Sequence, residues 1–224
     1  MADAAKIIEL RELLKERFPS AHSGRAPEPE TWPTGIPALD EAGIPMGGLT
    51  ELVSPTRSGG SALLLRGLLE KQVAAGHLPA LIDGRDSFEP RSLAPDVCDR
   101  LLWIRCRDTR ESLQAADILL RDGNLAFVVL DLQFNPAAEF RRIPATTWHR
   151  LQSLVARTGA VCLIMTPTRL VGSARLRLTL NSLLQIESLE RPAEKLRTEL
   201  RFDITRRRRA GRIEEPAALR QIAG

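Results

Sequence analysis

The chain has 224 residues, of which 43% are hydrophobic and 27% are charged, so it is long and apolar enough to form one packed domain. Its apolar runs reach about eight residues, whereas a membrane helix needs roughly 20, and its charged N-terminus is not that of a signal peptide. Three scattered cysteines and three histidines lack metal-ligand spacing. These features exclude a membrane protein, a disulfide-rich secreted domain and a zinc module, and they favour a cytoplasmic protein with reduced thiols.

Residues 4–18 predict an amphipathic helix, and residues 1–18 are assigned to it as a separate unit. Its apolar stripe consists of Ile7, Leu10, Leu14 and Phe18. Residues 19–31 are rich in Pro, Ser and Gly and predict an extended linker. We therefore expect the helix to pack either on its own domain or on another molecule.

Residues 32–209 predict an α/β core in which strands alternate with helices, and 210–224 a short basic tail. The strands are expected at 49–53, 79–84, 101–106, 125–132, 160–166, 183–188 and 199–205, and the helices at 61–75, 109–121 and 144–157. Several strands are apolar nearly throughout, which indicates burial on both faces of a parallel sheet. The pattern predicts a three-layer α/β/α fold with a mostly parallel sheet and antiparallel strands appended at its end.

The stretch "SPTRSGGS" (54–61) follows the first core strand and has the outline of a phosphate-binding loop. Such a loop reads G-x-x-x-x-G-K-[ST]: glycines let backbone N–H groups surround phosphates, the lysine reaches the β and γ phosphates, and the hydroxyl binds Mg²⁺. Gly59 and Ser61 match this pattern, but Ser54 replaces the first glycine and Gly60 replaces the lysine. An ordinary strand-to-helix turn explains the stretch equally well.

Asp131 ends the apolar strand "FVVLD" and is the second candidate. An acid at this place holds Mg²⁺ through water in many nucleotide sites, and it also serves as a plain turn residue in many folds. The sequence leaves both interpretations open.

In chain order, these segments resemble the RecA family over residues 32–209. The segment "TGIPALDEAGIPMGGLTELV" resembles the RecA segment that leads into the phosphate loop, and "ALIDGRDSFEP" resembles the second core strand and its turn. "FVVLDL" stands where the Walker B strand belongs, and "CLIMTPTR" resembles the strand that follows. The resemblance implies a RecA-like core and strengthens the interpretation of 54–61 as a phosphate loop.

The resemblance also implies that catalytic parts are missing. RecA-like ATPases carry a glutamate where Arg85 stands and a γ-phosphate-sensing glutamine where Pro167 stands, and the lysine position holds Gly60. An arginine cannot act as the base that activates water. We therefore expect a pseudo-ATPase without hydrolysis and with no required cofactor, although ATP and Mg²⁺ binding stays open. The remnants of the nucleotide site are Ser54, Gly59, Gly60, Ser61 and Asp131.

A degenerate RecA-like core is similar to the ImuA group and, more distantly, to the SulA cell-division inhibitors. Membership of the ImuA group implies an accessory factor in SOS-induced, error-prone translesion synthesis, near the nucleoid. Its implied partners are RecA, an ImuB-like polymerase homologue and a DnaE-type polymerase. Two alternatives stay open: an active DNA-dependent ATPase in which Arg57 or Arg85 replaces the lysine charge, and a SulA-type inhibitor.

Basic residues gather near the end of the chain. Residues 191–224 carry ten Lys or Arg against five Asp or Glu, while the whole chain has a net charge of +4. The peak comprises Arg206, Arg207, Arg208, Arg209 and Arg212. These side chains are candidates for contacts with DNA phosphates or with an acidic partner, or they form a solvated end.

Two loops correspond in order to the RecA DNA-binding loops. Residues 133–148 contain Arg141 and Arg142, which are candidates for contact with DNA or protein. Residues 168–182 carry three arginines and three alternating leucines, and we interpret the leucines, Leu176, Leu178 and Leu180, as core.

Overall fold

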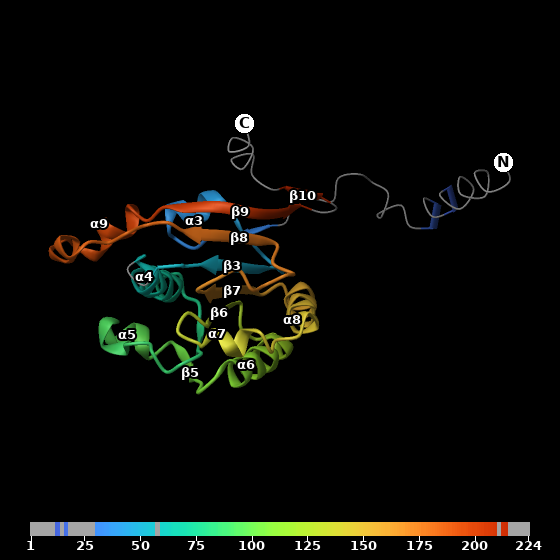
Figure 1. The fold of residues 1–224 in the computed structure, drawn as a ribbon, viewed down its shortest axis with the longest axis horizontal. Coiled ribbons are helices and arrows are strands. Elements are labelled where there is room, and N and C mark those ends of the chain that lie inside the picture. The colour runs from blue at the N-terminus through green and yellow to red at the C-terminus, as the bar shows by residue number, and fades with distance from the viewer. Residues whose placement is uncertain (1–11, 14–15, 18–29, 57–58, 210–211, 215–224) are drawn as a thin grey trace.

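The computed structural model describes residues 12–13, 16–17, 30–56, 59–209 and 212–214 (Figure 1). An eight-stranded sheet runs through the molecule in the order β10-β9-β8-β3-β7-β6-β4-β5. The strands from β8 to β5 are parallel to their neighbours, whereas β9 and β10 join antiparallel. Their bounds are β3 Leu49–Val53, β4 Ala80–Asp83, β5 Leu102–Arg105, β6 Phe127–Asp131, β7 Val161–Thr166, β8 Leu176–Leu180, β9 Phe202–Arg209 and β10 Arg212–Glu214.

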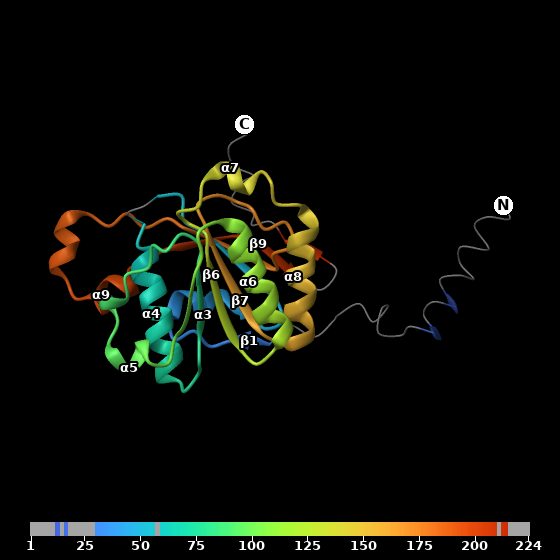
Figure 2. The same cartoon turned by 90° about the horizontal axis from the view of Figure 1, so that it is seen from below.

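Helices cover both faces of the sheet (Figure 2). One face carries α3 (Pro37–Ala42), α4 (Ser61–Ala74) and α5 (Pro95–Cys98), with α9 (Ala193–Thr198) beside α4. The other face carries α6 (Thr109–Asp122), α7 (Ala137–Phe140) and α8 (Ala145–Thr158). Short 3₁₀ helices span Pro90–Ser92 and Ile186–Glu190. The sequence-based prediction of a three-layer α/β/α fold with a mostly parallel sheet is confirmed.

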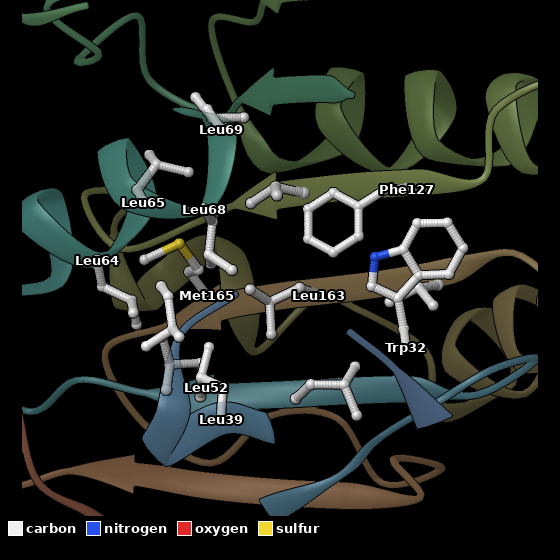
Figure 3. Packing of buried hydrophobic residues seen from close by; sticks show 14 of the residues in the cluster. Trp32, Leu39, Leu52, Leu64, Leu65, Leu68, Leu69, Phe127, Leu163 and Met165 are labelled. Carbon is white, nitrogen blue, oxygen red and sulfur yellow. The ribbon is translucent and has the colours of Figure 1, made fainter. Parts of the chain in front are cut away.

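Two hydrophobic cores lie on the two faces of the sheet because neighbouring residues of a strand point to opposite sides. Leu52 of β3 packs in the core beneath α4, and Leu49 packs in the core beneath α6 and α8. Figure 3 shows the first core, in which the leucines of α4 meet Leu163 and Met165 of β7. Both faces are covered, which explains why β3, β4, β6 and β7 are buried at every position.

The segment that precedes β3 is anchored to the first core. Its short hairpin of β1 (Thr31–Trp32) and β2 (Ile44–Pro45) places Trp32 against Phe127, with ring centroids 6.1 Å apart (Figure 3). The Trp32 indole donates a hydrogen bond to the Gln72 side chain of α4 at 2.9 Å. The Asp40 carboxylate accepts hydrogen bonds from the backbone N–H and the hydroxyl of Thr34, at 2.6 and 2.7 Å. The "TG" and "LD" pairs of the sequence therefore close a local turn.

One predicted strand is wrong, and strands β1, β2, β8 and β10 were not predicted. Residues 183–188 do not form a strand; a 3₁₀ helix covers Ile186–Glu190 instead. The sheet position beside β3 is taken by β8, which lies within 168–182, the segment assigned to a loop. The alternation L-R-L-T-L over 176–180 is a strand signal, and the three leucines are buried core residues as interpreted.

The ends of the chain fall largely outside the described residues. The predicted apolar stripe of Ile7, Leu10, Leu14 and Phe18 lies there, so the docking of the N-terminal helix stays a prediction. Thr31, assigned to the linker, begins β1, and the tail assigned to 210–224 contributes β10. No helix in the described part of the chain is long and apolar enough to cross a bilayer.

Candidate functional site

The candidate site lies at the edge of the sheet where parallel strands end, which is where α/β sheets bind ligands. The last residue of β3, Val53, is level with Thr166 at the end of β7. On the next strands, Asp131 of β6 is level with Asp83 of β4. The residues from Ser54 onward therefore leave the sheet at the edge that also carries both aspartates.

The loop after β3 closes on itself. Ser54 is buried, its backbone N–H donates to the Thr166 carbonyl at 2.8 Å, and its hydroxyl donates to the Thr56 carbonyl at 3.3 Å. The Gly59 N–H also points to the Thr56 carbonyl, at 3.2 Å. A phosphate loop instead turns such N–H groups toward its ligand. Arg57 and Ser58 lie outside the described residues.

Gly60 occupies the lysine position in a conformation that a lysine would not adopt without strain. Its φ of +85° lies in the left-handed region. A Cβ atom at this position would lie 2.7 Å from Cδ2 of Leu200 and 3.3 Å from Cδ1 of Leu184. Two leucine side chains therefore cover the N-terminal end of α4, where a phosphate-binding lysine would begin its side chain.

The two leucines belong to residues 181–201, which link β8 to β9 and run past α4 (Figures 1 and 2). Arg197 of α9 forms an ion pair with Glu70 of α4, and its side chain is only 12% exposed. A Cβ at Gly67 would lie 2.5 Å from Cδ of Arg197, so glycine leaves the room that this arginine fills. Gly60 and Gly67 thus both leave room for side chains of the segment between β8 and β9.

Asp131 is buried, and burial raises the pKa of its carboxyl group to about 6, with the negative charge of Asp83 acting in the same direction. Its carboxylate accepts a hydrogen bond from the Gln133 N–H at 3.0 Å, which opposes the rise in pKa. Asp131 lies two strands from β3, roughly 10 Å at the usual strand spacing. In the described residues, no cluster of three or more His, Cys, Asp or Glu side chains is arranged to hold a metal ion.

Asp83, the neighbour of Asp131, is used by the turn that follows β4. Its carboxylate accepts the backbone N–H groups of Ser87 and Phe88, at 3.0 and 2.8 Å. Arg85, at the position of the catalytic glutamate, donates to the Arg107 carbonyl at 2.6 Å and lies 3.7 Å from the Glu139 carboxylate. The Arg85 side chain therefore points toward Arg107, just before α6, and toward Glu139 of α7.

The end of β7 is also tied into the fold. Pro167 stands at the sensor position, and its side chain has no hydrogen-bonding group. The preceding Thr166 donates its hydroxyl proton to the fully buried Glu51 carboxylate at 3.3 Å. Glu51 also accepts the Val171 N–H at 3.0 Å and forms an ion pair with Arg177. This buried network fixes the loop after β7 against β3.

The five arginines of the predicted basic cluster lie in different surroundings. Arg206 donates to the Gly172 carbonyl at 2.9 Å, and Arg207 donates to the Ala42 carbonyl. Both are partly buried and attach β9 to its neighbours. Arg208 and Arg209 complete β9, and Arg212 begins β10. Contact of any of these five residues with DNA or a partner stays a prediction.

The structure therefore brings Ser54, Gly59, Gly60 and Ser61 together in one turn and keeps Asp131 on a separate strand. Sequence reasoning missed Leu184 and Leu200, which cover the turn. No local signal identifies them, because they lie more than 120 residues further along the chain. Taken together, the loop that bonds to itself and the leucines over Gly60 differ from the open phosphate loop that the pattern in 54–61 resembles.

Comparison with known proteins gives a partial relationship to RecA. Over 114 residues, the chain is 36% identical to protein RecA of Leifsonia xyli, a match that covers 48% of this chain and 31% of that protein. It is 28% identical over 157 residues to protein RecA of Chlorobaculum tepidum, covering 61% and 45% of the two chains. It is 34% identical over 115 residues to protein RecA of Streptomyces coelicolor, covering 48% and 30%. No family model matches the chain.

The fold and these matches support a place in the RecA-like superfamily, the class that the ordered motifs indicate. The chain spans less than half the length of the RecA proteins that it matches. The similarity alone therefore does not assign the activity or the partners of RecA to this chain.

Proposed function

We propose that this chain is a catalytically degenerate RecA-like protein of the ImuA type, which acts by binding other proteins of error-prone translesion synthesis. In this proposal, it contacts RecA and an ImuB-like polymerase homologue that works with a DnaE-type polymerase. It needs no cofactor and hydrolyses no ATP. The partial similarity to RecA supports the DNA-repair setting, and the finer assignment rests on the lost catalytic residues.

The main support comes from Gly60. A lysine there would have to leave the φ of +85° and displace Leu200, whose Cδ2 lies 2.7 Å from the position of a Cβ. In a phosphate loop, that lysine neutralises the β and γ phosphates. A site without it, with Arg85 for the catalytic glutamate and Pro167 for the sensor, lacks three groups that act on the γ-phosphate.

The alternative of an active ATPase needs another cation in place of the lysine. Arg85 is engaged by the Arg107 carbonyl and the Glu139 carboxylate, which speaks against it as the substitute. Arg57, the other candidate, lies outside the described residues. The SulA-type alternative has no specific support among the described contacts, and retention of FtsZ in place of RecA is the result that would favour it.

The test is a pull-down of purified RecA and of an ImuB-like partner by the full chain. A second protein lacks residues 1–29 and keeps Glu30, whose carbonyl accepts the Met46 N–H at 2.8 Å. A third replaces Arg208, Arg209 and Arg212 by alanine, and it spares Arg206 and Arg207 because their side chains hold the fold.

The proposal predicts that the full chain retains RecA and that removal of residues 1–29 abolishes this retention. Failure of the full chain to retain either partner contradicts the adaptor function. Full retention of RecA without residues 1–29 contradicts only the docking of the N-terminal helix.

A further inference from the structure

A groove of about 1190 Å³ is lined by residues of α6 and α8 and by Glu139 of α7. Figure 2 shows α6 and α8 on the face of the sheet that lies opposite α4. The two helices connect successive parallel strands, so they run side by side in the same direction. The volume exceeds the usual range for small-molecule pockets, roughly 300–1,000 Å³, and is large enough for a segment of polypeptide.

Part of the groove lining is apolar. Leu113 of α6 and Ile143, just before α8, line the groove and are half-buried. Ile118 of α6 also lines it and is 65% exposed. Covering these side chains would remove apolar surface from water, which is the main driving force for association.

The three carboxylates of the groove are already engaged by other groups of the chain. Asp117 forms ion pairs with Arg121 and Arg150, and its hydrogen bond from Arg150 is the main cause of its lowered pKa. Glu139 accepts the N–H and the hydroxyl of Thr109, at 2.9 and 2.7 Å.

Asp108, the third carboxylate, caps α6 by accepting the Glu111 N–H at 2.8 Å. Asp117 and Glu139 are thus paired with arginines, and Asp108 serves as the cap of α6.

Two of the three arginines that line the groove are not balanced in this way, whereas Arg150 is paired with Asp117. Arg110 of α6 and Arg142 after α7 are exposed. Within the described part of the chain, neither forms an ion pair or a side-chain hydrogen bond. The groove thus combines partly exposed aliphatic side chains with two available guanidinium groups, a surface complementary to apolar anchors flanked by carboxylates.

We propose that this groove is the docking site for an acidic amphipathic helix of another protein. The helix lays its apolar face on Leu113, Ile118 and Ile143 and places carboxylates at Arg110 and Arg142, as helices do in apolar grooves. A protein fits better than single-stranded nucleic acid because none of the lining residues is aromatic, so no platform for base stacking exists there. The proposal stands independently of any action with RecA.

The test selects ligands from a random library of 16-residue peptides displayed on phage, with the full chain as bait. The strongest binders are then synthesised, and their affinities are measured by fluorescence anisotropy. The groove variant is Arg110→Glu with Arg142→Glu, and the matched control is Arg157→Glu, an exposed arginine of α8 outside the groove. Circular dichroism melts verify that the variants fold, as expected because both groove arginines are exposed and unpaired.

The proposal predicts binders with spaced apolar residues and several Asp or Glu, about tenfold or more weaker on the groove variant and unchanged on the control. Replacing the peptide carboxylates by lysine should restore binding to the groove variant. The proposal is overturned if the binders lack acidic residues or bind both variants equally. It is also overturned if a single-stranded oligonucleotide, but no peptide, depends on the two arginines.

Discussion

Gly60 and Asp131 show how single residues determine what the carboxyl edge of the sheet can bind. Gly60 supplies a left-handed turn beneath Leu184 and Leu200, which a residue with a Cβ would strain. Asp131 keeps the identity expected of a Mg²⁺ ligand, but its burial favours the protonated form. The sequence reveals the change of lysine to glycine and cannot reveal that leucines from a distant segment cover it.

Substitution of Gly60 tests whether Leu200 covers the turn. Gly76 is the matched control, because its φ of +88° is similar and no atom lies within 4 Å of the place that a Cβ would take. Both changes to alanine incur the backbone strain, but only Gly60→Ala also meets Leu200. We expect Gly60→Ala to lose about 1–3 kcal/mol more stability than Gly76→Ala in urea denaturation, and we expect this difference to shrink when both changes are made in a Leu200→Ala background. Equal losses would show that Leu200 does not cover this position.

The pKa of Asp131 predicts a pH-dependent stability. Folding raises this pKa from 3.8 to about 6, so between these pH values the folded state binds more protons than the unfolded state. Stability therefore falls as the pH rises through this window, and the loss is complete above pH 6. The Asp131→Asn variant should be more stable than the wild type at pH 8, by up to about 3 kcal/mol, with the difference shrinking below pH 4. A difference that does not change with pH in thermal melts would contradict this account.

At the scale of elements, β8 and the segment after it account for most of the difference between the predicted and observed structures. The continuous apolar runs identify β3, β4, β6 and β7 because both faces of these strands are buried. Strand β8 has an alternating pattern that includes the charged Arg177, whose side chain pairs with the buried Glu51. A charged residue obscures the sequence signal of a buried strand when its partner lies far away in the chain. Pairing of this kind joins residues 126 positions apart, which local periodicity cannot indicate.

The pair of Glu51 and Arg177 predicts a large effect of one substitution. Arg177→Met leaves the Glu51 carboxylate buried with no cationic partner, which should cost about 3–5 kcal/mol. Arg107→Met is the control, because it breaks an exposed ion pair with Glu111 and should cost less than about 1 kcal/mol. Guanidinium denaturation measures both values. Similar small losses for the two variants would mean that the buried pair does not hold β8 to β3.

At the scale of the whole molecule, the order of the motifs predicted the three-layer fold correctly because strand order along the chain constrains the sheet. The same order located the phosphate-loop turn and Asp131 on one edge of that sheet. The groove between α6 and α8 was not predictable, because it depends on how two helices pack and on which arginines remain unpaired. The molecule thus keeps the framework of a RecA-like core with a covered turn at the place of the phosphate loop.

The central claim is that this RecA-like core no longer uses ATP, and calorimetry with Mg²⁺-ATP combined with an ATP-hydrolysis assay tests it most directly. The full chain, measured with and without single-stranded DNA, is compared with its Asp131→Ala variant. The account predicts no turnover above background in either protein, whether or not the calorimetry shows a heat of binding. Turnover by the full chain that disappears in Asp131→Ala would contradict the account and identify a working ATPase.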